Sequence, residues 1–574
     1  MHTADYIIVA AYLAVVIVLG RRSKAGTNSE EAFFLADRRL GRLRQFFFNF
    51  GHSTDANTAV STVSFTYSEG ASGAWLQLQM IFLNPYYWFM SVWFRRARLT
   101  TTAELLEERL ESPRLALVYA AFQIGVAIIG IAFSNFVAYK VTSALLDGVV
   151  VPPLLFYCGF VAVVGLYVAM GGLEATVLNQ VFQGSLVLVF SVILLPFGFR
   201  ALGPSGLHLR LPPRMFQLFA GGSGGQFTLW AVIAILLVSV VQINGNIINM
   251  GLAGAAKDEY AARFGAVSGT YGKRVMIVMW VFVGLIAAGL RPGGRLLTDP
   301  DLAWGALSHD LLGPGFLGLM LVGLLAANMA SVATKTMAVS ALFVRNLYRP
   351  LLGRSPGGGD VRAAQWAGIG ALAASVVVAL AMRGTMAVTK LILTINLPFG
   401  AAILMLFFWR RLTRSAVWWC IVLTGALIIA EPLGARATGD DHFSVGAWLL
   451  DLWLPGGAAQ GGGAKLAAQF FFDALFPFAV LIFVSLVTTP PPEATVDYFF
   501  GKLKTPVAAD RALDAAAVAE TRRDPRRFES ARLFPHSAWE FTRWDRVDAV
   551  GFAVCCGLSA AIILMFWGAL RLVS

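Results

Sequence analysis

The stretch NFGHSTDANTAVSTVSFTY, from Asn49 to Tyr67, decides the fold. It follows the apolar run Phe46 to Phe48 and precedes a second apolar segment, so it lies at membrane depth, yet it carries an acid, amides, a His and many hydroxyls. A charged carboxylate in a bilayer is costly unless it faces a protein interior, a partner or water, so Asp55 marks a functional site. Gly51 and the Ser/Thr run predict an unwound helix, which survives at this depth only where it lines a cavity.

The composition places the whole chain in the membrane. Hydrophobic residues make up 57% of the 574 residues and charged residues only 14%, against about 25% charged in soluble domains. The formal net charge is +12, but the Lys and Arg side chains form short clusters between apolar spans, which is typical of positive-inside loops. The predicted surroundings are therefore a lipid bilayer, and we expect no nucleic-acid partner.

The apolar spans predict about fourteen transmembrane helices, each near the twenty residues needed to cross the hydrocarbon. The first runs from Asp5 to Gly20 and is followed by a basic cluster. Alternate loops are basic, among them Arg95 to Arg114 and Lys257 to Arg274. By the positive-inside rule these loops lie in the cytoplasm. The sequence thus predicts an integral protein of the plasma (inner) membrane, with its N- and C-termini outside.

A second polar interruption, SVVQINGNIIN from Ser239 to Asn249, lies inside the span that begins near Phe227. It has the character of the first stretch and comes five spans later. This spacing predicts an all-α membrane protein with a five-plus-five inverted repeat, whose first and sixth core helices are broken and lie beside each other. The alternative is that each stretch is a continuous helix whose polar side chains bond to neighbouring helices.

Several motifs give the chain a resemblance to the sodium/solute symporter family of sodium-coupled sugar, proline, iodide and sialic acid transporters. Their order and spacing over about 450 residues make chance unlikely as an explanation. The motifs are FFLADRRLG (33–41), TTAELLEERL (101–110), YVAMGGLEATVLNQVFQ (167–183), AAKDEYAARFG (255–265), DPDLAWGAL (299–307), the segment 315–348 that ends in ALFVRNLY, NLPFGAAILMLFFWRRLTRSA (396–416) and SLVTTPP (485–491). The resemblance implies the leucine-transporter-type fold, with extra helices at both ends and transport by alternating access.

The resemblance also implies a sodium site between the break of the first core helix and the eighth core helix. The candidate cation-binding residues are Ser53, Thr54, Asp55, Ala327, Ala330, Ser331 and Lys335. The family's hydroxyl pair falls on Ala330 and Ser331, so one hydroxyl is missing. Because sodium needs several hard oxygen ligands, we expect Asp55 to compensate, which gives a sodium set of Asp55, Ala327 and Ser331.

Two further departures from the family pattern concern charge. Where many members carry an Asp on the fifth core helix, this chain has Asn179-Gln180. Lys335 stands one turn after Ser331, and helical side chains lean toward the N-terminus, so its ammonium is aimed back toward Ser331. Lys335 then pairs with Asp55 or replaces the sodium ion; alternatively it reaches for the cytoplasmic interface.

The resemblance places substrate contacts at the same breaks and on the second core helix. The candidate substrate-binding residues are Asn57, Gln77, Gln79, Ser239, Gln242 and Asn244. All are neutral donors and acceptors, which suit a small polar solute such as a sugar, amino acid, nucleoside or carboxylate. We expect the groups on the sixth core helix to face a hydrated cavity.

The predicted organisation follows from these assignments. Residues 1–43 form the first helix and a cytoplasmic loop, 44–200 the first repeat, 201–412 the second repeat, 413–487 two accessory helices and an outer loop, and 547–574 the final transmembrane helix. Residues 488–546 form a cytoplasmic linker whose mixed charges are typical of a solvated segment or an amphipathic helix. No nucleophile elbow, metal-binding His/Glu pair or phosphate loop is present, so we expect no enzyme activity and no cofactor besides the coupling sodium ion.

Three functions fit the sequence. A sodium-coupled secondary transporter that imports a small polar solute is favoured. A proton-coupled or uncoupled transporter of the same fold, with Lys335 as internal cation, is the alternative. A non-transporting membrane sensor would need a signalling domain, for which 488–546 is too short.

Overall fold

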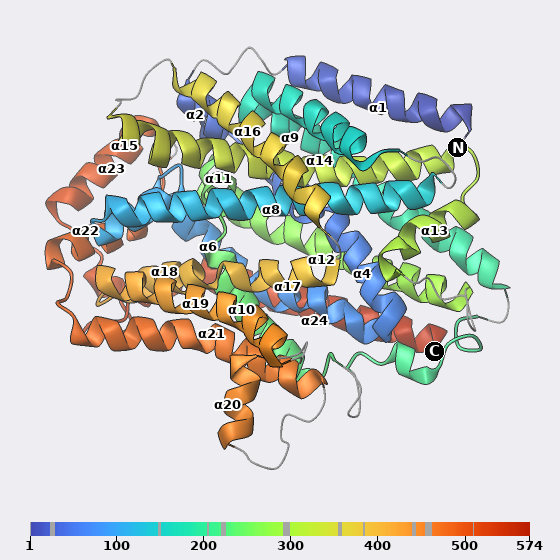
Figure 1. Ribbon diagram of the computed structural model, residues 1–574. Helices are drawn as coiled ribbons and strands as arrows, with labels where there is room; N and C mark the ends of the chain where they lie inside the picture. Colours follow the sequence, from blue (N-terminus) through green and yellow to red (C-terminus); the bar gives the residue numbers. More distant parts are fainter. Residues whose placement is uncertain are drawn as a thin grey trace.

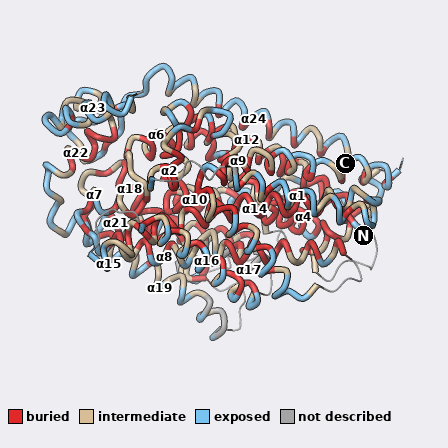
Figure 2. The backbone as a smooth tube through the Cα atoms, turned by 90° about the horizontal axis from the view of Figure 1, so that it is seen from above, coloured by how far each residue is buried: buried red, intermediate tan, exposed pale blue. Residues whose placement is uncertain are grey.

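The computed structural model describes residues 2–22, 29–146, 151–203, 206–219, 226–290, 299–353, 359–382, 385–438, 444–453, 462–508 and 510–574. Within these ranges the chain is helical, with three isolated bridges and no longer strand. Long helices run side by side through the molecule (Figure 1), and Figure 2 shows the buried residues gathered along its middle.

The helices up to the second break are α1 (Thr3–Arg22), α2 (Glu30–Leu35), η2 (Ala36–Arg38), α3 (Arg42–Ser53), α4 (Ala56–Glu69), η3 (Gly70–Ala74), α5 (Trp75–Leu78), η4 (Gln79–Leu83), α6 (Asn84–Ala97), α7 (Thr102–Leu110), α8 (Pro113–Leu145), α9 (Pro153–Leu202), η6 (Pro213–Phe216) and α10 (Leu229–Asn244). The remaining helices are α11 (Ile248–Gly254), α12 (Glu259–Leu290), η7 (Pro300–Leu302), α13 (Ala303–Leu311), α14 (Phe316–Leu342), η8 (Phe343–Tyr348), α15 (Arg349–Leu352), α16 (Asp360–Ala381), α17 (Thr385–Ile395), α18 (Leu397–Phe408), α19 (Arg414–Thr438), α20 (Val445–Trp453), α21 (Gly462–Val487), α22 (Glu493–Lys504), α23 (Arg511–Arg523), η9 (Glu529–Ala531) and α24 (Arg546–Val573).

The first predicted break is confirmed and lies between α3 and α4. Thr54 leaves the helical conformation at φ −102° and ψ 69°, and Asp55 is extended at φ −92° and ψ 162°. The Asp55 carboxylate accepts a hydrogen bond from the backbone N–H of Thr58 at 3.0 Å. An N-cap residue makes this contact, so Asp55 begins the next helix. The polar residues of the stretch therefore break the helix and also define where it resumes.

The second predicted break is confirmed between α10 and α11, whose axes are bent by 68°. Gly245 lies at the break, where an added Cβ would come within 3.0 Å of the Asn396 carbonyl oxygen. The carbonyl of Gly245 itself accepts hydrogen bonds from the Tyr119 hydroxyl at 3.0 Å and the Gln123 amide at 2.9 Å. At this carbonyl, side chains of α8 supply the hydrogen bonds that the break removes from the helix.

The number of spans is only partly settled by helix length. Nine helices in the described ranges are long and apolar enough to cross a membrane, and ten if α10 and α11 together count as one span. One of them, α9, has 50 residues and contains Gly172 at φ 57° and ψ −144°, so two helices meet there. At 1.5 Å per residue α9 exceeds twice the roughly 30 Å of hydrocarbon, and fourteen spans stay a prediction.

One predicted loop is wrong. The basic segment Lys257 to Arg274 is not an interfacial loop, because α12 begins at Glu259 and continues to Leu290 without interruption. Lys273 and Arg274 are 9% and 2% exposed, inside the bundle. Two cations that were assigned to the aqueous side are therefore buried.

The segment 488–546, which we name the C-terminal strap, is folded against the bundle and contains the helices α22 and α23. Of the two predicted alternatives, the structure agrees with a helical segment and not with a solvated linker. Arg98, before α7, donates to Asp514 of α23 at 2.7 and 2.8 Å. Lys502 of α22 pairs with Glu108 of α7 at 2.7 Å. The charged side chains of the strap thus form ion pairs with partners on one face of the bundle. This face lies opposite the two chain ends (Figure 1).

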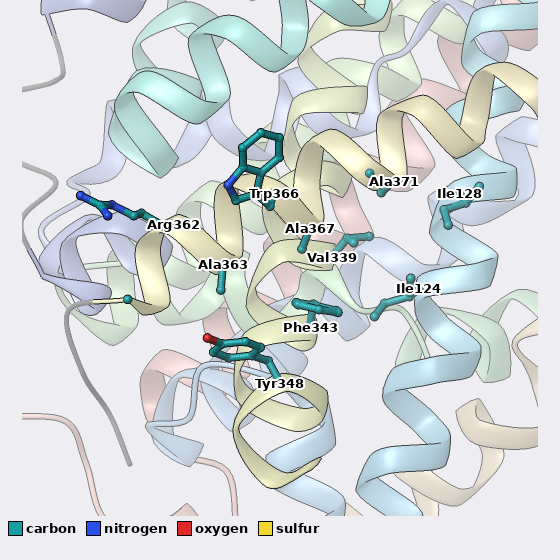
Figure 3. Close-up of a pocket in the computed structure, with 12 residues that line it drawn as sticks. Ile124, Ile128, Val339, Phe343, Tyr348, Arg362, Ala363, Trp366, Ala367 and Ala371 are labelled. Carbon is teal, nitrogen blue, oxygen red and sulfur yellow. The ribbon is translucent and has the colours of Figure 1, made fainter. Parts of the chain in front are cut away.

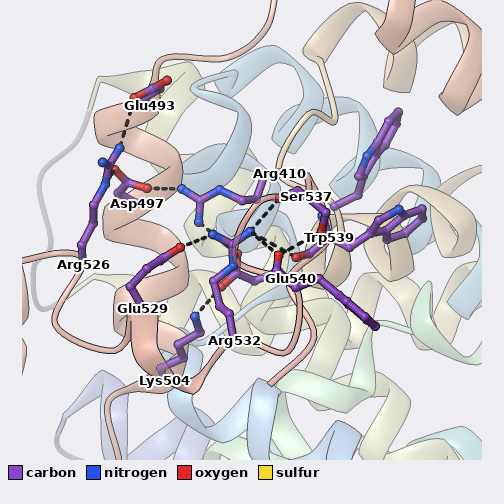
Figure 4. Close-up of polar contacts among 12 residues, drawn as sticks. Arg410, Glu493, Asp497, Lys504, Arg526, Glu529, Arg532, Ser537, Trp539 and Glu540 are labelled. Atoms are coloured by element: carbon purple, nitrogen blue, oxygen red, sulfur yellow. Dashed lines mark hydrogen bonds and ion pairs between the residues drawn. The ribbon is translucent and has the colours of Figure 1, made fainter. Parts of the chain in front are cut away.

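A second group of ion pairs fixes the end of the strap to α18. The side chain of Glu540 is 2% exposed and accepts from Arg410 at 2.9 Å, and it also contacts Lys504 and Arg532. Arg410 also pairs with Asp497. Figure 4 shows these groups converging between α22 and the segment before α24. Breaking a buried ion pair leaves an uncompensated charge. Detaching the strap would therefore cost free energy, so the strap is an integral part of this face.

Candidate functional site

The carboxylate of Asp55 is the anionic centre of the first break. One of its oxygens accepts the Thr58 hydroxyl at 2.7 Å in addition to the Thr58 backbone N–H. The other faces Ser331 Oγ of α14 and Asn57 Nδ2, both at 3.4 Å. Asp55 therefore joins the first broken helix to the eighth core helix, with one oxygen weakly bonded. Cation binding there stays a prediction.

Lys335 lies on the same face of α14, but its ammonium does not touch Asp55. Lys335 Nζ contacts the Gly130 carbonyl oxygen of α8 at 3.4 Å, and no described ion pair within 4.0 Å joins it to Asp55. Gly130 also accepts from Ser134 Oγ at 3.1 Å, and Ser134 accepts from Asn57 Nδ2 at 2.9 Å. The two charges are thus linked by a short hydrogen-bond chain through α8, and the ammonium stays inside the bundle.

Lys273 of α12 is a third charge at this site, and sequence reasoning missed it. Lys335 and Lys273 are the two cations whose charges act on Asp55. Lys273 has no hydrogen bond or close ion pair among the described residues. Lys273 stands next to Arg274, so the pair looks in the sequence like the end of a basic loop. The residues on both sides of the pair continue the helix, and this pattern could have indicated that Lys273 lies inside a span.

The other predicted cation ligands are placed around the break. Thr54 is fully buried and its hydroxyl has no partner in the described structure, whereas Ser53 Oγ donates to the Phe50 carbonyl at 3.3 Å. The Ala330 carbonyl accepts the Gln180 amide at 3.0 Å. Gln180, which stands where the family resemblance implies an acid, bonds to α14 from α9. Hard oxygens free to hold sodium are therefore the Thr54 hydroxyl, one Asp55 oxygen and the Ser331 hydroxyl.

The predicted substrate residues form pairs between helices. Gln79 of η4 donates to Ser239 Oγ of α10 at 3.1 Å. The Tyr86 hydroxyl of α6 contacts Asn244 Oδ1 at 2.5 Å, and Asn244 is fully buried. These pairs hold α10 against the second core helix, so a solute that uses them must displace an existing hydrogen bond.

Two other predicted substrate residues differ in their surroundings. Gln242 is 8% exposed and no hydrogen bond of its side chain is described. The backbone carbonyl of Gln77 faces Arg274 of α12 at 3.5 Å. Binding by any of the six predicted substrate residues stays a prediction.

A cavity of about 80 Å³ lies between α3, α6, α10, α11 and α12, on the α3 and α11 side of the breaks. Residues of both broken helices line this cavity, so the two breaks lie beside each other, as predicted. Its polar lining consists of Asn49, His52, Ser53, Tyr87, Ser91, Asn249 and Thr270. Of these only Ser53 was predicted as a site residue. Asn49, His52 and Asn249 lie inside the two polar stretches but were not singled out, whereas Tyr87, Ser91 and Thr270 were missed because their helices α6 and α12 carry no polar run that stands out in the sequence.

A larger groove of about 620 Å³ lies elsewhere and contains none of the predicted residues. It is formed by α8, α14, η8 and α16, and Figure 3 shows apolar side chains such as Phe343 and Ile128 around it. Trp366 on its rim is 72% exposed on α16, a helix able to cross a membrane. The groove therefore opens on the outer surface of the bundle. The candidate site around Asp55 lies apart from it, at the helix breaks.

Two broken helices that face each other, with a buried carboxylate where the first restarts, define a polytopic membrane protein of the leucine-transporter-type fold. The solved structure of a Na+-coupled sialic acid symporter in its substrate-bound outward-open state has this fold. It superposes with a TM-score of 0.66 at 14% identity, covering 85% of this chain and 99% of that one.

The chain belongs to the sodium:solute symporter family, whose pattern matches residues 33–424. Among curated relatives, it is 21% identical to sodium/myo-inositol cotransporter 2 of Bos taurus over 62% of this chain and 58% of that protein. It is 23% identical to the high-affinity proline transporter PutP of Bacillus subtilis over 64% of this chain and 74% of that protein. The match thus spans less than two thirds of the bovine relative.

Proposed function

We propose that this protein is a secondary active transporter that imports a small polar solute by alternating access, driven by sodium. The observation that carries the proposal is the carboxylate of Asp55, held at the first break and facing Ser331 on α14 at 3.4 Å. Transporters of this architecture hold the coupling cation at the unwound backbone of a helix break, and an ionisable group inside a membrane bundle marks such a site. The similarity to sodium/myo-inositol cotransporter 2 supports it.

Sodium would be held by the free oxygens around the break. The Thr54 hydroxyl, one Asp55 oxygen and the Ser331 hydroxyl are hard ligands, and the carbonyl of Ala327 completes the proposed set. The absence of a hydroxyl at Ala330 is then offset by a charged oxygen, which a cation prefers to a neutral one.

The proposed organisation follows the helix order. Residues 44–200 and 201–412 are the two inverted repeats, 413–487 the accessory helices and 547–574 the final span. The protein lies in the inner membrane with both termini outside, because the strap and the basic loops share the face opposite the chain ends.

Sodium-driven uptake into proteoliposomes tests the proposal. Solutes of the polar classes are offered with and without an inward sodium gradient, first to the wild type. Ser331→Ala should raise the sodium concentration for half-maximal uptake by roughly tenfold, since one ligand is worth about 1.4 kcal/mol or more. Thr336→Val is the matched control, because in the described ranges the one hydrogen bond of the Thr336 hydroxyl is to its own helix, at Val332 O. Equal sodium dependence in all three proteins would contradict the sodium site.

A second candidate function is supported by the position of Lys335. Its ammonium is inside the bundle against Gly130, where it can serve as an internal cation in place of sodium. In that case uptake by the wild type ignores sodium, and Lys335→Met acquires a dependence on it. The same uptake assay therefore separates the two functions.

A further inference from the structure

A second large cavity, of about 850 Å³, lies between α6, α24, the end of α18 and the strap. The proposed transport function makes no use of it. Packed helices leave few voids larger than a water molecule, and this volume is within the roughly 300–1,000 Å³ of pockets that enclose small molecules. The cavity is therefore a candidate binding site.

The walls of the cavity are one apolar face of α6 and one of α24. Their lining residues recur at the spacing of a helix face: Tyr86, Phe89 and Trp93 on α6, and Phe552, Cys556 and Ile563 on α24. The lining of α24 extends from Asp548 to Ile563, a rise of roughly 22 Å. Half of the hydrocarbon of a bilayer is about 15 Å thick, so the cavity is long enough for the acyl chain of a lipid.

The cavity is open to the surroundings of the bundle at both ends. Trp544, before α24, lines its strap end and is 54% exposed, and aromatic side chains of this kind are typical of the membrane interface. At the other end Ser559 of α24 donates to the Ile81 carbonyl of η4 at 3.0 Å, and the neighbouring Phe82 lines the cavity and is 45% exposed. Because α24 is apolar and long enough to cross the membrane, the cavity opens toward lipid.

Four cations line the strap end of the cavity, and three of them already have an anionic partner. The pairs are Arg96 with Glu259 at 2.8 Å, Arg263 with Asp548 at 2.6 Å, and Lys504 with Glu540. The fourth is Arg543, whose side chain has no hydrogen bond or ion pair within the described part of the chain. One guanidinium in the lining is therefore available to a ligand.

The acids in the lining are engaged as well. Glu540 and Asp548 belong to the pairs just given, and the Asp545 carboxylate accepts the backbone N–H of Asp548 at 2.6 Å, where it caps α24. The group left over at this end is thus a cation. A guanidinium matches the oxygens of a phosphate group, and the apolar walls beyond it match a hydrocarbon chain.

We propose that the cavity between α6, α24 and the strap binds one anionic phospholipid, with its phosphate at Arg543 and an acyl chain along α6 and α24. A free phosphate would leave the apolar walls uncovered, and a fatty chain without a phosphate would leave Arg543 unpaired. The site is independent of the proposed transport function. It borders the second break, because the hydroxyl of Tyr86 in its wall contacts Asn244 Oδ1 at 2.5 Å.

Lipid titration of the purified full-length protein in a nonionic detergent tests the site. Dioleoyl phosphatidylglycerol, dioleoyl phosphatidylcholine and sn-glycerol 3-phosphate are added separately, and native mass spectrometry counts the bound molecules. We expect the first phosphatidylglycerol to bind about tenfold more tightly than phosphatidylcholine, whose ammonium adds a positive charge beside Arg543, and we expect no binding of glycerol phosphate. Phosphatidylglycerol should also raise the midpoint of thermal unfolding, because it binds the folded state.

Two variants separate the headgroup from the chain, each with a matched control. Arg543→Gln should weaken phosphatidylglycerol about tenfold and leave phosphatidylcholine unchanged, whereas Arg523→Gln, on the exposed end of α23 outside the cavity, should change neither. Ala560→Phe fills the cavity and should weaken both lipids. Ala553→Phe, on an exposed position of α24 that does not line the cavity, should weaken neither.

Four results would overturn the inference. They are equal affinity for the two lipids, binding of glycerol phosphate as tight as that of phosphatidylglycerol, equal behaviour of Arg543→Gln and Arg523→Gln, and unchanged lipid binding by Ala560→Phe. If Ala560→Phe does not fold, the comparison of the two lipids in the wild type and in Arg543→Gln still decides, because Arg543 is exposed and its replacement removes no described contact of the side chain.

Discussion

Replacing Asp55 by Asn removes the negative charge from the first break while keeping the shape of the cap. Asn is as good an N-cap residue as Asp, so the hydrogen bond to Thr58 can persist and the change isolates charge. Lys335 and Lys273 then lose their only nearby anion among the described residues. Removing one partner of a buried charge pair typically costs 3–5 kcal/mol. Because no described ion pair within 4.0 Å involves Asp55, we expect a loss at the lower end, about 3 kcal/mol.

The coupling between Asp55 and Lys335 follows from their separation. Two unit charges 4 Å apart interact by about 4 kcal/mol at an effective dielectric constant near 20, and by less at greater distance. The hydrogen-bond chain through Asn57, Ser134 and Gly130 adds a second route. We therefore expect an interaction energy of about 1–3 kcal/mol in the cycle of Asp55→Asn and Lys335→Met.

The assay is chemical unfolding of the four proteins in detergent micelles, read by tryptophan fluorescence. The double variant should be more stable than Asp55→Asn, but less stable than the wild type, since Lys273 still lacks an anion. Adding Lys273→Met should recover part of the remainder. Effects of Asp55→Asn and Lys335→Met that add to within about 0.5 kcal/mol would refute the electrostatic link.

Two further predictions concern packing and the strap. Gly400→Ala should destabilise the protein by about 1–3 kcal/mol, because the added Cβ would lie 2.2 Å from the Val241 carbonyl oxygen. The control is Gly425→Ala, which has open space around it and should change the unfolding free energy by less than about 1 kcal/mol. Equal effects of the two substitutions would contradict the close contact of α10 and α18. Burial acts to raise the pKa of Asp514, but hydrogen bonds from the Arg98 guanidinium and the Ala508 backbone N–H outweigh it and hold that pKa below its ordinary value. The strap should therefore stay attached above the ordinary pKa and loosen as the pH falls through the lowered one. Hydrogen exchange of α23 measures this, and unchanged protection at a pH where the Asp514 carboxylate is protonated would contradict it.

Both breaks could be predicted from the sequence because their causes are local. A capping acid after a glycine and a run of hydroxyls, or Asn and Gly in an apolar span, disturb a helix whatever surrounds it. The cap formed by Asp55 and the bend at Gly245 need only their own segments to be recognised. The identity of the helices that face each other followed from their spacing.

The partners of the charges could not be predicted in the same way. Helix geometry aims Lys335 toward Ser331, but the acceptor it reaches is the Gly130 carbonyl, which belongs to another helix. Lys273 reads as interfacial until the packing of α3 and α6 on α12 is known. The strap's partners are equally distant: Arg98 and Asp514 are separated by 416 residues. Mixed charge in a sequence does not distinguish a solvated segment from a docked one.

This separation has a consequence for how the protein is made. Ribosomes add about 5–20 residues per second, so Arg98 emerges roughly 20–80 s before Asp514 exists to receive it. Throughout that interval the face built by α6, α7 and the end of α18 carries guanidinium and carboxylate groups whose partners have not been synthesised. Assembly of this face is therefore the last step of biogenesis, and a nascent chain stalled before α22 should be held by the insertion machinery or degraded, even though every core helix is already in the membrane.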